Sequence, residues 1–141
     1  MNTLKTTTLI ALALIIGLSS CKKTETANLK MSFSGLESLG ADYQYEGWLI
    51  VNGKPISAGI FDIDASGNPT ITDFDVKDIN FDKVERYVLT IEPNPDPSPD
   101  PAAVHILAGD VNSNIANLTV DHSSALGTNF TASTGKYILA T

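Results

Sequence analysis

YEGWLIVNGKPISAGIF, residues 45–61, is the stretch that decides the fold class of this chain. Apolar and polar residues alternate on both sides of Asn52-Gly53, a dipeptide that tolerates the positive φ angles of a two-residue type I′ turn. The pattern predicts that residues 45–51 and 54–61 pair as a β-hairpin. Because side chains alternate along a strand, one face should carry Tyr45, Gly47, Leu49 and Val51, and the other Glu46, Trp48 and Ile50.

The lone tryptophan of this hairpin has two interpretations. Large aromatic side chains usually bury most of their area, which favours packing of Trp48 over its display to a ligand. The neighbouring Gly47 indicates a bulge or the close approach of another group. The alternative is an exposed aromatic patch of Tyr43, Tyr45 and Trp48 that serves as a ligand surface, and it stays open at this level.

Short strand-like runs recur along the rest of the chain. They are LKMSFSG (29–35), RYVLTIEP (86–93), VHILAGDV (104–111), IANLTV (115–120) and YILA (137–140). Clusters rich in Gly, Pro, Asn and Asp separate them, and one brief helical turn is expected near residues 78–85, with Ile79, Phe81 and Val84 pointing inward. The sequence predicts one all-β domain over residues 29–141, an antiparallel immunoglobulin-like β-sandwich.

The first twenty residues have the parts of a bacterial lipoprotein signal peptide. Lys5 precedes an apolar run, Leu9–Leu18, which is too short for a finished membrane span of about 20 residues. Leu18-Ser19-Ser20-Cys21 follows and resembles the lipoprotein box, in which the cysteine is acylated, for example with palmitate, and becomes the first mature residue. We therefore expect a signal peptide (1–20), a tether (21–28) and anchoring to a membrane through Cys21.

The charge of the chain and the types of residue it contains argue against nucleic-acid binding, metal binding and catalysis. The mature chain would carry eight Lys/Arg against sixteen Asp/Glu, and this acidic balance argues against nucleic acid as a partner. The loop DIDASGNPTITD (62–73) has oxygen ligands at EF-hand spacing, but Pro69 and the missing flanking helices favour a plain turn. Neither His105 nor His122 belongs to a catalytic motif, so we expect no enzyme, no metal and no cofactor.

Three motifs in order carry a resemblance to a known family. YEGWLIVNGKPISAGIFDID, YVLTIEPNPDPSPDP and HILAGD are similar to the C-terminal domain of anti-sigma-K factors, over roughly residues 29–120. The resemblance implies an extracytoplasmic β-sandwich that belongs to a membrane-bound regulator. None of its motifs is catalytic.

The chain departs from that family's whole-protein pattern. An anti-sigma factor of this kind holds its sigma factor with a cytoplasmic helical domain joined through a membrane span, and only a signal and a tether precede the module here. We therefore expect no direct binding of a sigma factor. Similar lipoproteins continue into a second copy of the module, which leaves open that this chain is a truncated form.

Two functions from different classes follow. The first is a lipid-anchored extracytoplasmic binding or sensing module, which recognises an envelope protein or glycan at the aromatic patch. The second is a structural surface lipoprotein without a specific ligand. Lys22 after the anchor does not settle whether the inner or the outer membrane holds the chain.

Overall fold

The computed structural model describes residues 26–126. The predicted lipidation site Cys21 and the strand-like run 137–140 lie outside this range. Seven strands and one short 3₁₀ helix follow one another along the described chain: β1 (Ala27–Lys30), β2 (Tyr43–Val51), β3 (Lys54–Phe61), β4 (Asp73–Val76), η1 (Phe81–Lys83), β5 (Val84–Pro93), β6 (His105–Asn112) and β7 (Ile115–Ala116).

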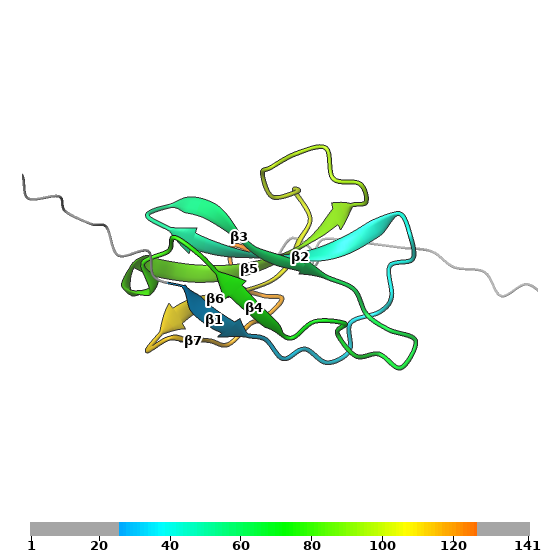
Figure 1. Ribbon diagram of the computed structural model, residues 1–141, viewed down its shortest axis with the longest axis horizontal. Helices are drawn as coiled ribbons and strands as arrows, with labels where there is room; N and C mark the ends of the chain where they lie inside the picture. Colours follow the sequence, from blue (N-terminus) through cyan, green and yellow to red (C-terminus); the bar gives the residue numbers. More distant parts are fainter. Residues whose placement is uncertain (1–25, 127–141) are drawn as a thin grey trace, which may run out of the picture.

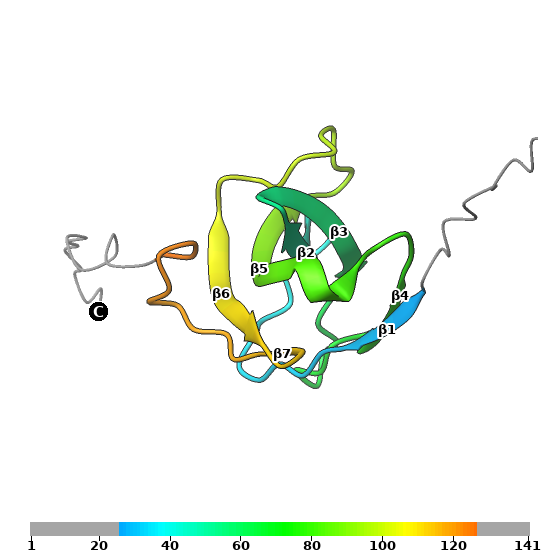
Figure 2. The ribbon, with the colours of Figure 1, turned by 90° about the vertical axis from the view of Figure 1, so that its left-hand side faces the viewer.

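The strands form two antiparallel sheets that enclose one core (Figures 1 and 2). The larger sheet has the order β3-β2-β5-β6-β7, and the smaller one consists of β1 and β4. In the immunoglobulin fold, strands C′, C, F and G adjoin in one sheet and strands B and E in the other. β3-β2-β5-β6 and β1-β4 reproduce these two sets, so the predicted antiparallel immunoglobulin-like sandwich is confirmed.

The β2–β3 hairpin forms with the predicted boundaries. Val51 pairs with Lys54 across the turn, and Asn52 and Gly53 have φ angles of 51° and 72°, which is the positive pair that a type I′ turn needs. The expected alternation also holds. Tyr45 and Leu49 belong to the main core between the sheets, and Trp48 belongs to a second buried cluster on the outer face of the larger sheet.

Phe61 lies at the centre of the main core, with 1% of its surface exposed. Its ring stacks on Phe33 at a centroid distance of 5.2 Å and on Tyr45 at 5.4 Å, and meets Phe74 edge-on at 6.4 Å. These four rings come from both sheets and from the segment after β1. Burial of such aromatic area stabilises the sandwich more than any single polar contact in it.

Two paired glycines let aromatic rings lie directly on the backbone of the hairpin. Gly47 of β2 is the register partner of Gly59 of β3, next to a register shift between the two strands. A Cβ atom on Gly47 would lie 2.0 Å from the Tyr87 hydroxyl oxygen, and one on Gly59 would lie 2.1 Å from the Phe74 ring. The predicted close approach at Gly47 is thus the packing of Tyr87.

We expect Gly47→Ala to lower the free energy of unfolding by about 1–3 kcal/mol, because the new methyl group would force the buried Tyr87 ring out of its packed position. Chemical denaturation would measure the loss. Tyr87→Phe removes the hydroxyl that the new methyl group meets first, so the double variant should lose less than the sum of the two single variants. If the stability losses of the two single variants simply add up in the double variant, the clash between the new methyl group and the Tyr87 hydroxyl would be contradicted.

The sandwich is closed along one side, where the two sheets are in contact, and open along the other. β3 lies against β4 on one side. On the other side, β7 and β1 are separate edges that face each other across an opening (Figure 2). The strand expected over residues 29–35 ends at Lys30, and Met31 N then donates to Thr72 O at 2.8 Å. Leu29, Met31 and Phe33 nevertheless pack against the core.

The helical turn and the acidic loop lie close to where the sequence placed them. η1 begins after Asn80, whose side chain accepts a hydrogen bond from Asp82 N, and Ile79 and Val84 are buried. The loop after β3 is closed by a bridge between Ile63 and Pro69, but the next strand starts only at Asp73 and pairs with β1. Within residues 26–126, no helix is long and apolar enough to cross a membrane.

Candidate binding groove

The structure confirms that Trp48 is packed, and it contradicts the alternative of an exposed aromatic patch for two of the three residues in that patch. Tyr43 is 51% exposed, but Tyr45 and Trp48 are each only 3% exposed. They also lie on opposite faces of β2, because successive side chains of a strand point to opposite sides. Tyr45 donates its hydroxyl to the Glu37 carbonyl at 2.8 Å, and burial raises the pKa of this phenol.

Trp48 instead anchors a buried polar network on the outer face of the larger sheet. Its Nε1 donates to Thr90 Oγ1 at 2.9 Å, and the threonine hydroxyl donates in turn to Glu92 Oε1. The Glu92 carboxylate also accepts from Ala102 N, at 2.9 and 3.1 Å. Thr90 and Glu92 are almost fully buried. The network therefore fixes the proline-rich loop between β5 and β6 onto the sheet.

Glu46 is a second buried carboxyl group of this face, and Ser57 Oγ donates to it. Burial raises its pKa above the ordinary value of 4.5; the Ser57 hydrogen bond partly opposes the shift, and the negative charges of Glu92 and Asp96 add to it. The folded state thus favours the protonated form. The stabilisation that this group contributes is complete below its unfolded-state pKa and is lost as the pH rises through the folded-state pKa.

We expect Glu46→Gln to remove this part of the pH dependence. Between pH 4.5 and neutrality, the free energy of unfolding of the unsubstituted chain should fall relative to that of the variant, which cannot ionise at this position. Denaturant titrations at a series of pH values would measure the difference. The exposed Glu85→Gln on β5 is the matched control, and an identical pH trend for both variants would contradict the role of Glu46.

The two histidines belong to a cluster around Asp110 of β6. Arg86 Nε donates to Asp110 Oδ1 at 2.9 Å, His122 Nε2 lies 3.4 Å from the same oxygen, and the neighbouring guanidinium lowers the pKa of this carboxyl. Ser124 Oγ accepts from Arg86 Nη1 at 2.7 Å, while His105 Nδ1 lies 2.9 Å from Ser124 O. Ser124 N also donates to His122 Nδ1 at 3.0 Å. The cluster holds residues 119–126 against the sheet.

The acidic loop 62–73 is ordered by its own hydrogen bonds. Asp64 Oδ1 accepts from Ser66 N and Asn68 N, both at 2.9 Å, and these bonds lower its pKa. Such a ring is typical of an Asx turn. Across residues 26–126, no three His, Cys, Asp or Glu side chains gather in an arrangement that could hold a metal ion.

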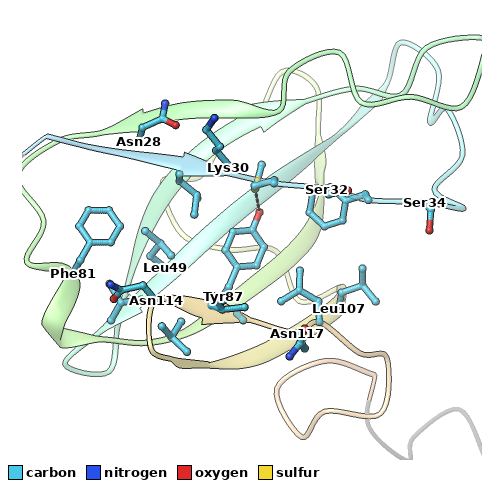
Figure 3. Close-up of a pocket in the computed structure, with 18 residues that line it drawn as sticks. Asn28, Lys30, Ser32, Ser34, Leu49, Phe81, Tyr87, Leu107, Asn114 and Asn117 are labelled. Carbon is cyan, nitrogen blue, oxygen red and sulfur yellow. Dashed lines mark hydrogen bonds between the residues drawn. The ribbon is translucent and has the colours of Figure 1, made fainter.

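The opening between β1 and β7 forms an elongated groove with a volume of about 950 Å³ (Figure 3). One wall is the continuous segment Asn28–Ser34, and the other is residues 114–118 together with Leu107 and Val111. The floor consists of the core side chains Leu49, Phe81, Val84 and Tyr87. Tyr87 points across the floor, and its hydroxyl donates to Met31 Sδ at 2.6 Å.

The backbone edges of the chain face this groove. Side chains of a strand alternate between two faces, yet every residue from 28 to 34 contributes to one wall and every residue from 114 to 118 to the other. β1 pairs with β4 along one edge only. Within the described residues, Met31 makes the one backbone–backbone hydrogen bond of segment 31–34. The groove thus combines unpaired backbone groups with an apolar floor.

The position of the groove follows from the strand order. In the immunoglobulin fold, strand A pairs with the free edge of strand B, which β1 represents here. Among residues 26–126 no strand occupies that place. The alternation of Leu29, Met31 and Phe33 predicted a strand in the segment that forms this wall. The sequence pattern did not indicate that the segment borders a binding groove.

An all-β sandwich with an open, apolar strand edge defines a class of protein, the immunoglobulin-like module. The comparison with protein families identifies the family within this class. The model of the family described as "Anti-sigma-K factor rskA, C-terminal" matches residues 16–114, which is well over half of the chain. The chain belongs to this family. No curated protein and no solved structure gave a match.

Proposed function

We propose that this chain is a lipid-anchored, extracytoplasmic binding module that takes up an extended segment of an envelope protein in the groove between β1 and β7. The observation that carries the proposal is the groove itself, because unpaired strand edges over an apolar floor suit an added strand. Family membership and the Leu18–Cys21 box support an extracytoplasmic, anchored location.

A protein ligand fits this groove better than a glycan does. Sugar rings are commonly held by exposed aromatic faces, and the patch expected to offer them is buried at Tyr45 and Trp48. The groove offers instead apolar side chains and unpaired backbone groups. Its walls carry neutral polar side chains such as Ser32, Asn114 and Asn117, and one cation, Lys30.

Site-specific photo-crosslinking in the native envelope tests the proposal. A photoreactive residue at Ser32 or Asn114, one on each wall, should give a discrete adduct with the same envelope protein. Ser66 in the exposed acidic loop serves as the control position. The purified partner should bind the purified full chain, and Leu107→Asp in the groove should weaken this binding. Equal adducts at all three positions would contradict a groove-specific ligand.

The alternative function is a structural surface lipoprotein without a specific ligand. The many hydrogen bonds that fix the exposed loops favour it, because rigid acidic loops also suit a surface coat. It predicts that the crosslinks at Ser32 and Ser66 do not differ. The same experiment therefore separates the two functions.

Direct binding of a sigma factor is not part of the proposed function. Export through residues 1–20 would place the sandwich across the membrane from the transcription machinery. We expect co-purification from intact cells to recover envelope proteins and no sigma factor. Stoichiometric recovery of a sigma factor would contradict the expectation that the chain does not bind one. It would not by itself contradict the binding of an extended segment in the groove.

A further inference from the structure

We propose that the chain's own residues 136–140, KYILA, bind as a strand in the groove between β1 and β7 and take the place of strand A. The groove would then have a resident intramolecular ligand that any partner must displace. This goes beyond the proposed function, because it names a regulatory segment within the chain.

The dimensions of the groove and of the segment agree. The wall that Asn28–Ser34 forms is seven residues long, whereas KYILA has five residues and would extend about 17 Å as a strand. Tyr137, Ile138, Leu139 and Ala140 are all apolar, so either face of such a strand could lie on the apolar floor. β-branched and aromatic residues within it favour the extended conformation.

The chain is long enough to reach the groove. Leu118 lines the groove, and Leu126 follows eight residues later, so the two are separated by at most about 29 Å. Residues 127–136 can span roughly 33 Å when extended. Even in the least favourable geometry, this link covers the separation.

Charge also favours the segment over an arbitrary strand. Residues 26–126 carry a net formal charge of −10, from five Lys/Arg against fifteen Asp/Glu. Residues 127–141 contain one lysine, Lys136, and no acidic residue. Their attraction to the acidic sandwich is long-ranged and weakens with salt.

Disulfide scanning in the full chain tests the proposal. With Cys21→Ser the chain has no other cysteine, so Lys30→Cys can be combined in turn with cysteine at 137, 138, 139 or 140. Alternate positions, either 137 and 139 or 138 and 140, should oxidise on the order of tenfold faster than their neighbours, because disulfides demand close Cβ atoms. Lys54→Cys at the β2–β3 turn, which is not among the residues that line the groove, is the matched control.

The outcomes separate the candidate occupants. An intramolecular disulfide with period two supports the proposal. A disulfide between two chains would overturn it in favour of a second copy's segment, and rates equal to those with Lys54→Cys would overturn it in favour of an outside ligand. The envelope crosslinks at Ser32 do not depend on these rates, so failure here leaves the proposed function intact.

A cysteine-free measurement guards against artefacts of oxidation. Tyr137→Asp with Leu139→Asp, and separately Ile138→Asp, should raise the hydrogen exchange of residues 28–34 on the order of tenfold, because their edge amides lose a partner. Thr134→Asp in the link adds the same charge outside the segment and should leave exchange unchanged. Equal exchange in all variants would contradict the proposal.

Discussion

Replacing Cys21 with serine is expected to abolish lipid attachment and to release the chain from the membrane. Cys21 is the only thiol of the sequence, so no other residue can take an acyl chain in its place. Acyl chains hold a protein at a bilayer through about 0.8 kcal/mol for each buried CH₂ group, and a serine variant loses all of them. Incorporation of an alkyne-labelled fatty acid, together with fractionation after a carbonate wash, measures both effects.

The matched control for this experiment lies one residue earlier. Ser20→Ala keeps a small side chain before the cysteine and should remain lipidated and membrane-bound. The fold of the serine variant should be unchanged, because the sandwich is built from residues 26–126. Firm membrane retention of the serine variant without label would show that the anchor is not the Cys21 acyl group.

Phe61→Ala should cause the largest loss of stability among single core substitutions, about 3–5 kcal/mol. The ring is 1% exposed and touches Phe33, Tyr45 and Phe74, which belong to separate parts of the chain. Because backbones on both sides fix these neighbours, they cannot close the cavity fully. Total stabilities of domains lie near 5–15 kcal/mol, so the variant would lose a large share.

Equilibrium denaturation measures this loss, with the preceding residue as control. Ile60 is 43% exposed, and Ile60→Ala at the same strand should cost much less, on the order of 0.5 kcal/mol. Phe61→Leu keeps most of the volume and should fall between the two. Similar losses at residues 60 and 61 would indicate that the face of β3 toward the core has been misassigned.

The local pattern of the sequence was sufficient to predict the β2–β3 hairpin and the elements near it. Asn52-Gly53 dictated a turn through its tolerance of positive φ, and the period of two assigned Tyr45 and Leu49 to one face and Trp48 to the other. The same reasoning found the turn at η1 and the close approach at Gly47. These features depend on backbone geometry within a few residues, which composition and spacing express directly.

The candidate site needed contacts between distant segments. Alternation told which faces Trp48 and Tyr45 occupy, and it favoured packing of Trp48. It still left an exposed aromatic patch open, because the groups that cover Trp48, such as Thr90 and Ala125, come from distant segments. The raised pKa of Glu46 likewise arises from burial, to which the charges of Glu92 on β5 and Asp96 in the proline-rich loop add.

The groove is the clearest case of a feature that only the tertiary structure decided. Its two walls lie some 80 residues apart in the sequence, and neither segment is unusual by itself. The opening exists because β3 meets β4 at one side of the sandwich while β1 and β7 do not meet at the other. The sequence by itself determined which segments become strands and which side chains turn inward. Which strand edges stay unpaired depends on how the sheets pack, because pairing is a property of the whole arrangement and not of any one strand.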